Sequence, residues 1–68
     1  MNEYTHYNRI KYVLVEKNNT GIWLSEQMGC NLGTVSRWIT NKFQPSVEQM
    51  YDMARHLGID VRELFVAS

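Results

Sequence analysis

The chain has 68 residues, which is the size of one small domain with a thin core, because a chain this short buries only about 60% of its unfolded surface. Its 44% hydrophobic and 21% charged residues, with four glycines and one proline, exclude a disordered or fibrous chain. It is also too short for a two-domain cofactor enzyme. We therefore expect one domain over residues 1–68, with no cofactor and no small-molecule ligand.

The sequence does not support a membrane span, an internal disulfide or a zinc site. The longest unbroken apolar run is residues 12–15, whereas about 20 residues are needed to span a bilayer. No basic and apolar leader opens the chain, and a lone Cys30 cannot form an internal disulfide. His6 and His56 with that one cysteine cannot supply the clustered ligands of a zinc site. We expect a cytoplasmic module without metal or membrane contact.

The net charge of zero hides a division between the two parts of the chain. Residues 1–42 hold five basic and three acidic side chains, and residues 43–68 hold two basic and four acidic ones. A weakly positive first part and a weakly negative second part fit a molecule that presents one face to a polyanion.

The first part of the chain has the spacing of short helices. Ile10, Val13 and Leu14 follow an i, i+3, i+4 pattern that predicts an amphipathic helix over about residues 8–17. Thr20 is a good N-cap for a second helix over residues 21–28.

Gly29 should end that second helix, because glycine tolerates the left-handed conformation of a helix C-terminus. Asn31 can cap a third helix over residues 32–40, in which Val35 and Trp38 occupy core positions.

Two further helices follow a loop at residues 41–45. Ser46 and Gln49 match a capping box that opens a fourth helix, and Gly58 closes it. The apolar side of this helix is expected to hold Val47, Met50, Met53, Ala54 and Leu57. Asp60 can cap a short fifth helix. We therefore predict an all-α, compact five-helix bundle without strands.

The segment from Thr20 to Trp38 combines a helix, a tight turn and a second helix. Two helices joined in this way cross steeply, and in DNA-binding helix-turn-helix proteins the second one lies in the major groove. With Val35 and Trp38 in the core, the outer face of the third helix is mostly small or polar. Arg37 could bind a guanine edge or a phosphate, and Thr34 and Ser36 could bond either.

Phosphate contacts are expected at both ends of this unit. Thr20 stands where free backbone N–H groups and the helix dipole favour an anion, and Lys42 follows the third helix directly. Such contacts fix the register of a protein on DNA rather than its choice of sequence.

The segments TGIWLSEQMG, TVSRW, ITNKFQPSVEQMYDMARHLGID and VRELF, in this order and spacing, resemble the helix-turn-helix domain of phage Cro- and repressor-type regulators, the xenobiotic-response-element family. The resemblance covers about residues 8–65. It implies a lambda-repressor-like fold, with the helix-turn-helix formed by the second and third helices. Residues 1–7, outside the resemblance, are expected to form an N-terminal arm that either packs on the fold or frays. The matching hydrophobic frame is Leu24, Met28, Val35, Trp38, Met50, Ala54, Leu57 and Leu64.

The resemblance also implies a set of contact residues. The family's base-facing positions are Leu32, Gly33, Thr34 and Arg37 here, and its phosphate-contacting positions are Thr20 and Gly21 with Asn41, Lys42 and Gln44 of the loop. Independently of the resemblance, Ser36 is added to the phosphate-contacting residues because its hydroxyl can bond a phosphate. This chain departs from the family at Gly21, where a long polar side chain is common, and at Leu32 and Gly33, which cannot donate hydrogen bonds through a side chain.

These features predict sequence-specific binding of double-stranded DNA by a transcriptional regulator, expected to be a repressor that associates with the nucleoid. One recognition helix binds weakly, so a homodimer on two half-sites is expected. Its surface should include Ile59, Phe65 and Val66, because the last segment has more apolar residues than its length can bury.

The alternative is a protein-interaction module, such as an antitoxin or a regulatory subunit, that keeps this fold with weak DNA contact. The neutral net charge, Leu32 and Gly33 favour it. An enzyme is not expected, because the sequence holds no recognisable nucleophile set, paired-carboxylate site or phosphate-binding glycine loop.

Overall fold

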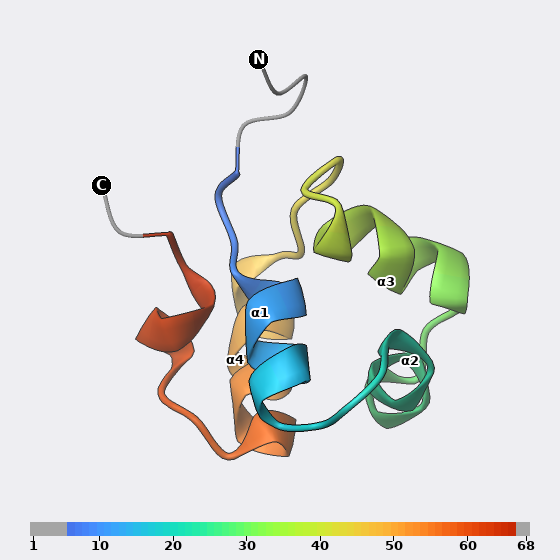
Figure 1. Cartoon of the computed structure of the whole chain (residues 1–68). Helices are drawn as coiled ribbons and strands as arrows, with labels where there is room; N and C mark the ends of the chain where they lie inside the picture. Colours follow the sequence, from blue (N-terminus) through green and yellow to red (C-terminus); the bar gives the residue numbers. More distant parts are fainter. Residues whose placement is uncertain (1–5, 67–68) are drawn as a thin grey trace.

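The structure, a computed structural model, describes residues 6–66. Within this range the chain forms α1 (Ile10–Glu16), α2 (Gly21–Met28), α3 (Leu32–Ile39), α4 (Val47–Leu57) and a single-turn 3-10 helix, η1 (Val61–Leu64). Figure 1 shows α2 and α3 together on one side of the molecule and η1 on the other side. The predicted all-helical class is confirmed for this part of the chain.

The expectation of five helices is wrong at the last segment, where the structure has only the 3-10 turn η1. Asp60 caps it, with its side chain accepting the Arg62 N–H at 2.9 Å. The backbone then becomes extended at Phe65, which forms an isolated antiparallel bridge with Asn8. The Val66 N–H donates to the Tyr7 carbonyl at 3.0 Å. This pairing uses the backbone groups that a longer helix would need.

The helix boundaries follow from local chemistry. Thr20, Asn31 and Ser46 each accept a backbone N–H in the first turn of α2, α3 and α4, as predicted. Gly29 and Gly58 end α2 and α4 with φ of +68°, a conformation in which a side chain is rarely tolerated.

One core joins all of these elements. Its buried apolar side chains come from α1, α2, α3, α4 and η1: Ile10, Val13, Leu14, Leu24, Val35, Trp38, Met50, Met53, Ala54, Leu57 and Leu64. Two expectations about the core need correction. Val47 is 70% exposed, because the first residue of α4 stands outside the packed region, and Met28 is only half-buried against the core.

Three amide side chains fasten the start of the chain to the loop that follows α3. Asn41 lies in the left-handed region, with φ of +63°, and its side chain is only 8% exposed. Its Oδ1 accepts the backbone N–H groups of Tyr7 and Asn8, both at 2.9 Å, and the Gln44 amide at 3.3 Å. Its Nδ2 donates to the Asn8 carbonyl at 3.2 Å.

Asn8 completes this network from the other side. Its buried amide donates to the Trp38 carbonyl at 3.0 Å and to Gln44 Oε1 at 2.7 Å, while its Oδ1 accepts the Ile10 N–H at 3.1 Å. Of the N-terminal arm expected at residues 1–7, residues 1–5 lie outside the described residues, and Tyr7 is held by backbone hydrogen bonds. The network therefore ties α1, the end of α3 and its following loop into one unit.

We predict that Asn41→Gly lowers the free energy of unfolding by about 1–3 kcal/mol, because two backbone N–H groups lose their shared acceptor. Asn41→Ala should cost about 1 kcal/mol more, since it also places a Cβ in the left-handed region. Urea denaturation followed by tryptophan fluorescence measures both.

Asn18 provides the matched control for these variants. It also has a positive φ, of +57°, but its side chain is exposed. Asn18→Gly should leave stability within about 1 kcal/mol of the parent. An Asn41→Gly protein as stable as the Asn18→Gly protein would contradict the assigned role of the network.

Candidate nucleic-acid interface

The sharp turn between α2 and α3 is built from local hydrogen bonds. The Cys30 N–H donates to the Ser25 carbonyl at 3.1 Å as the chain leaves α2 through the left-handed Gly29. Asn31 then starts α3 immediately, with its Oδ1 accepting the Thr34 N–H at 2.8 Å. Cys30 is a free cysteine that lies half-buried against the core. The turn therefore fixes the direction of α3 relative to α2.

Gly21 lies where the start of α2 meets α3. A Cβ at this position would lie 3.2 Å from Ile39 Cδ1 and 3.7 Å from Leu32 Cδ1. A larger side chain would require these neighbours to move. The absence of a long polar side chain at Gly21 thus allows the two helices to approach closely, and only its backbone can meet a ligand.

The third helix has one buried and one exposed face. Val35 and Trp38 are buried, and Trp38 is only 3% exposed, so the core interpretation of this tryptophan is confirmed. The residues on the other side are exposed, namely Leu32, Gly33, Ser36 and Arg37. Figure 1 shows α3 at the edge of the molecule. The outer face of α3 defined by these four residues is therefore available to a ligand.

Two of the predicted base-facing residues have particular surroundings. The Thr34 hydroxyl donates to Asn31 Oδ1 at 3.1 Å, and the residue is half-buried, so this hydroxyl supports the cap of α3. Gly33 is exposed, and a Cβ there would meet only Asn31 Oδ1, at 3.2 Å. Gly33 therefore presents only its backbone on the outer face of α3.

Thr20 is placed to meet an anion at the start of α2. Its side-chain oxygen accepts the Trp23 N–H at 3.0 Å, which leaves the hydroxyl proton for an outside acceptor. The residue is exposed, and the positive end of the eight-residue helix lies beside it. Trp23 itself is half-buried and packs against the core.

The loop after α3 divides the remaining predicted residues into two kinds. Lys42 is exposed, and its backbone N–H donates to the Arg37 carbonyl at 2.9 Å. Asn41, a predicted phosphate contact, is buried and its amide is bonded to Tyr7 and Asn8 instead. Gln44 is exposed, but its amide bonds with Asn8 and Asn41.

The ion pairs of the described residues lie in the second part of the chain, away from the outer face of α3 in the sequence. Two ion pairs occur among residues 6–66, Asp52–Arg55 and Asp60–Arg62, and both lie on the second part of the chain. Hydrogen bonds from the Arg62 side chain and backbone lower the pKa of Asp60 to about 2. Arg37 and Lys42 take part in neither ion pair, so the cations beside the outer face of α3 keep their charge for an outside anion.

Phe43 is a feature of this surface that the sequence analysis did not select. The Arg37 guanidinium carbon lies over its ring, 5.8 Å from the centroid. Phe43 is 59% exposed although it stands in a loop of mostly polar residues. An isolated aromatic residue in a polar loop is the sequence feature from which this exposed ring could have been predicted.

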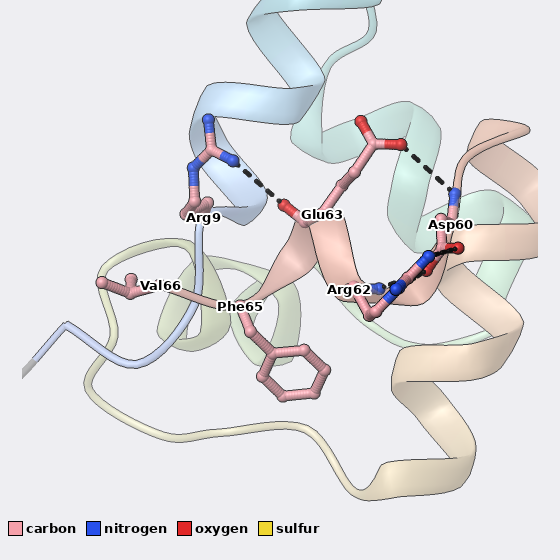
Figure 2. Close-up of a pocket in the computed structure, with 6 residues that line it drawn as sticks. All are labelled: Arg9, Asp60, Arg62, Glu63, Phe65 and Val66. Carbon is pink, nitrogen blue, oxygen red and sulfur yellow. Dashed lines mark hydrogen bonds and ion pairs between the residues drawn. The ribbon is translucent and has the colours of Figure 1, made fainter. Parts of the chain in front are cut away.

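The predicted dimer residues lie in the last part of the sequence, after α4. Ile59 is half-buried against the core, whereas Phe65 and Val66 are exposed. Figure 2 shows both in an open groove with Arg9, Asp60, Arg62 and Glu63, and their side chains point in different directions. The structure therefore does not bring the three residues into one apolar patch.

No group of three or more His, Cys, Asp or Glu side chains among residues 6–66 could hold a metal ion. None of the helices in this part of the chain is long and apolar enough to cross a membrane.

The chain is similar to known proteins over most of its length. A family model described as "Helix-turn-helix" matches residues 10–64. A crystal structure described as that of "a putative DNA-binding protein from Bacteroides fragilis" is 48% identical with a TM-score of 0.87, and the match covers 88% of this chain and 97% of that chain. A search of curated proteins finds no match. The resemblance inferred from the sequence is thus confirmed, and the chain belongs to the helix-turn-helix family of Cro- and repressor-type proteins.

Proposed function

We propose that the chain binds double-stranded DNA sequence-specifically and regulates transcription, with α3 in the major groove. The observation that carries this proposal is the outer face of α3, which is exposed at Leu32, Gly33, Ser36 and Arg37 while the helix packs against α2. The family membership and the DNA-binding protein from Bacteroides fragilis support it. The proposed role is binding rather than catalysis.

Base recognition is assigned mainly to Arg37 and Leu32. A guanidinium can donate two hydrogen bonds to O6 and N7 of guanine, and an exposed leucine can contact the methyl group of thymine. Gly33 is exposed and has no side chain, which would let the DNA approach the backbone of the helix closely. Thr34 contributes at most as an acceptor while its hydroxyl supports the cap of α3.

Phosphate contacts are assigned to both ends of the helix-turn-helix. Thr20 and the Gly21 backbone N–H would hold one phosphate at the start of α2, where the helix dipole favours negative charge. Ser36 and Lys42 would face the DNA backbone on the other side, whereas the predicted contact of Gln44 is not proposed because its amide bonds with Asn8 and Asn41. These few contacts predict weak binding by one copy at physiological salt.

The proposal also includes repression of transcription and dimerisation on DNA. Occupying a site on nucleoid DNA in the cytoplasm is enough to exclude a competing protein, so a domain of this size suits a repressor. Two copies on half-sites one helical turn apart would double the contacts. Because Phe65 and Val66 are the exposed members of the predicted dimer set, the dimer surface is proposed around them.

Arg37→Ala and Lys42→Ala should have different effects on DNA binding. Using a duplex selected from a random library, we predict that Arg37→Ala costs about 1–3 kcal/mol and relaxes preference at one base pair. Lys42→Ala should weaken binding to all duplexes alike and reduce the slope of log K against log salt by about one. Fluorescence anisotropy at several salt concentrations measures both effects. If the parent protein bound no duplex even at low salt, the protein-interaction alternative would replace this proposal.

Selected sites should be palindromic if the dimer proposal is correct, with half-sites about 10 base pairs apart. Sedimentation on such a duplex should give two chains per site, and Phe65→Glu with Val66→Glu should reduce this to one without changing the half-site. A strict monomer on a palindromic duplex at saturating protein would contradict dimerisation.

A further inference from the structure

The contact between Arg37 and Phe43 joins the outer face of α3 to the loop that follows it. The guanidinium carbon lies 5.8 Å from the ring centroid, within the range of about 6 Å in which a cation is attracted to an aromatic face. Both side chains are exposed. Neither a hydrogen bond nor an ion pair of the Arg37 side chain occurs among residues 6–66. The contact with the Phe43 ring is therefore the one side-chain interaction of this guanidinium that the structure shows within residues 6–66.

The backbone of Phe43 is held beside Arg37 by hydrogen bonds. The Arg37 carbonyl accepts the Phe43 N–H at 3.2 Å and the Lys42 N–H at 2.9 Å. The chain reverses at the left-handed Asn41, whose buried amide is fixed to the start of α1. A side chain at position 43 is therefore presented beside Arg37 by a rigid turn and not by a free loop.

We propose that Phe43 is a positioning residue, which orients the Arg37 guanidinium for guanine before DNA arrives. This inference rests on the proposed function, because it assumes that Arg37 reads a base. An aromatic ring attracts the face of a guanidinium, whereas the N–H donors that bind O6 and N7 lie in the guanidinium plane. Attraction to the Phe43 ring would thus restrict the side chain while leaving its donors free, so that less rotamer entropy is lost on binding.

A second pair in the molecule provides a matched control. The Arg9 guanidinium carbon lies 4.5 Å from the centroid of the Tyr12 ring. Arg9 also donates to the Glu63 carbonyl at 3.5 Å, so its donors are partly used within the protein (Figure 2). Tyr12 belongs to α1 and not to the outer face of α3 or its loop. Removing that ring should leave base discrimination unchanged.

Phe43→Leu tests the proposal, because it keeps an apolar side chain and removes the aromatic face. On the selected duplex we expect affinity to fall about two- to fivefold. The loss should be concentrated at the base pair read by Arg37, defined as the one where Arg37→Ala loses its preference. Two duplexes measure this loss: the selected one, with guanine at that base pair, and one in which that base pair is replaced. The ratio of the affinities for the first and the second duplex should fall by the same factor. Phe43→Tyr should retain the parent ratio, as should Tyr12→Leu.

A double-mutant cycle and a measurement on the free protein make the test sharper. In an Arg37→Ala background, Phe43→Leu should cost nothing further at that base pair. In the free protein, the Arg37 side-chain protons should show ring-current shifts that Phe43→Leu abolishes. This second readout needs no DNA and would not respond to a general loss of stability.

The outcomes separate this inference from the proposed function. Absence of parent binding to any duplex at low salt would reject the DNA-binding function and this inference with it. If the parent binds and Phe43→Leu has no effect, or weakens binding equally for every sequence, the positioning role is overturned while the function stands. A loss confined to the base pair of Arg37, absent in the Arg37→Ala background, supports it.

Discussion

The hydrogen-bonded amides of Asn8, Asn41 and Gln44 are the constraint on which the placement of α3 depends. Because the Asn41 oxygen accepts two backbone N–H groups from the start of the chain, the end of α3 cannot move without breaking them. The same network bonds the Trp38 carbonyl, and Trp38 is the largest core residue that α3 contributes. The loop that presents Lys42 and Phe43 begins at Asn41. A small domain thus gains a rigid binding edge from polar contacts as well as from its core.

The arrangement of charge explains how a chain with no net charge can address a polyanion. Two of the seven basic side chains, Arg55 and Arg62, form ion pairs within the second part of the chain. Arg37 and Lys42, beside the outer face of α3, take part in neither. What a ligand meets is the local field of the exposed face and not the net charge, which is why the balance of seven basic and seven acidic residues carries little information.

The sequence predicted the features that depend on neighbouring residues. The caps at Thr20, Asn31 and Ser46, the left-handed ends at Gly29 and Gly58, and the buried Trp38 all follow from short-range rules. Features that depend on distant parts of the chain were missed. The pairing of residues 65 and 66 with residues 7 and 8 shortens the last helix to a turn. The amide of Asn41 is used 33 positions away along the chain, so its sequence neighbours gave no sign of its burial.

The surface used for DNA is tested most directly by amide chemical shifts in the protein during titration with a duplex selected from a random library. If the outer face of α3 enters the major groove, the largest changes should fall on residues 32–37, on residues 20–22 at the start of α2, and on residues 42–44. The amides of α4 and η1 should change little outside the proposed dimer surface at Phe65 and Val66. Changes centred on α4 or η1, with α3 unaffected, would contradict the account.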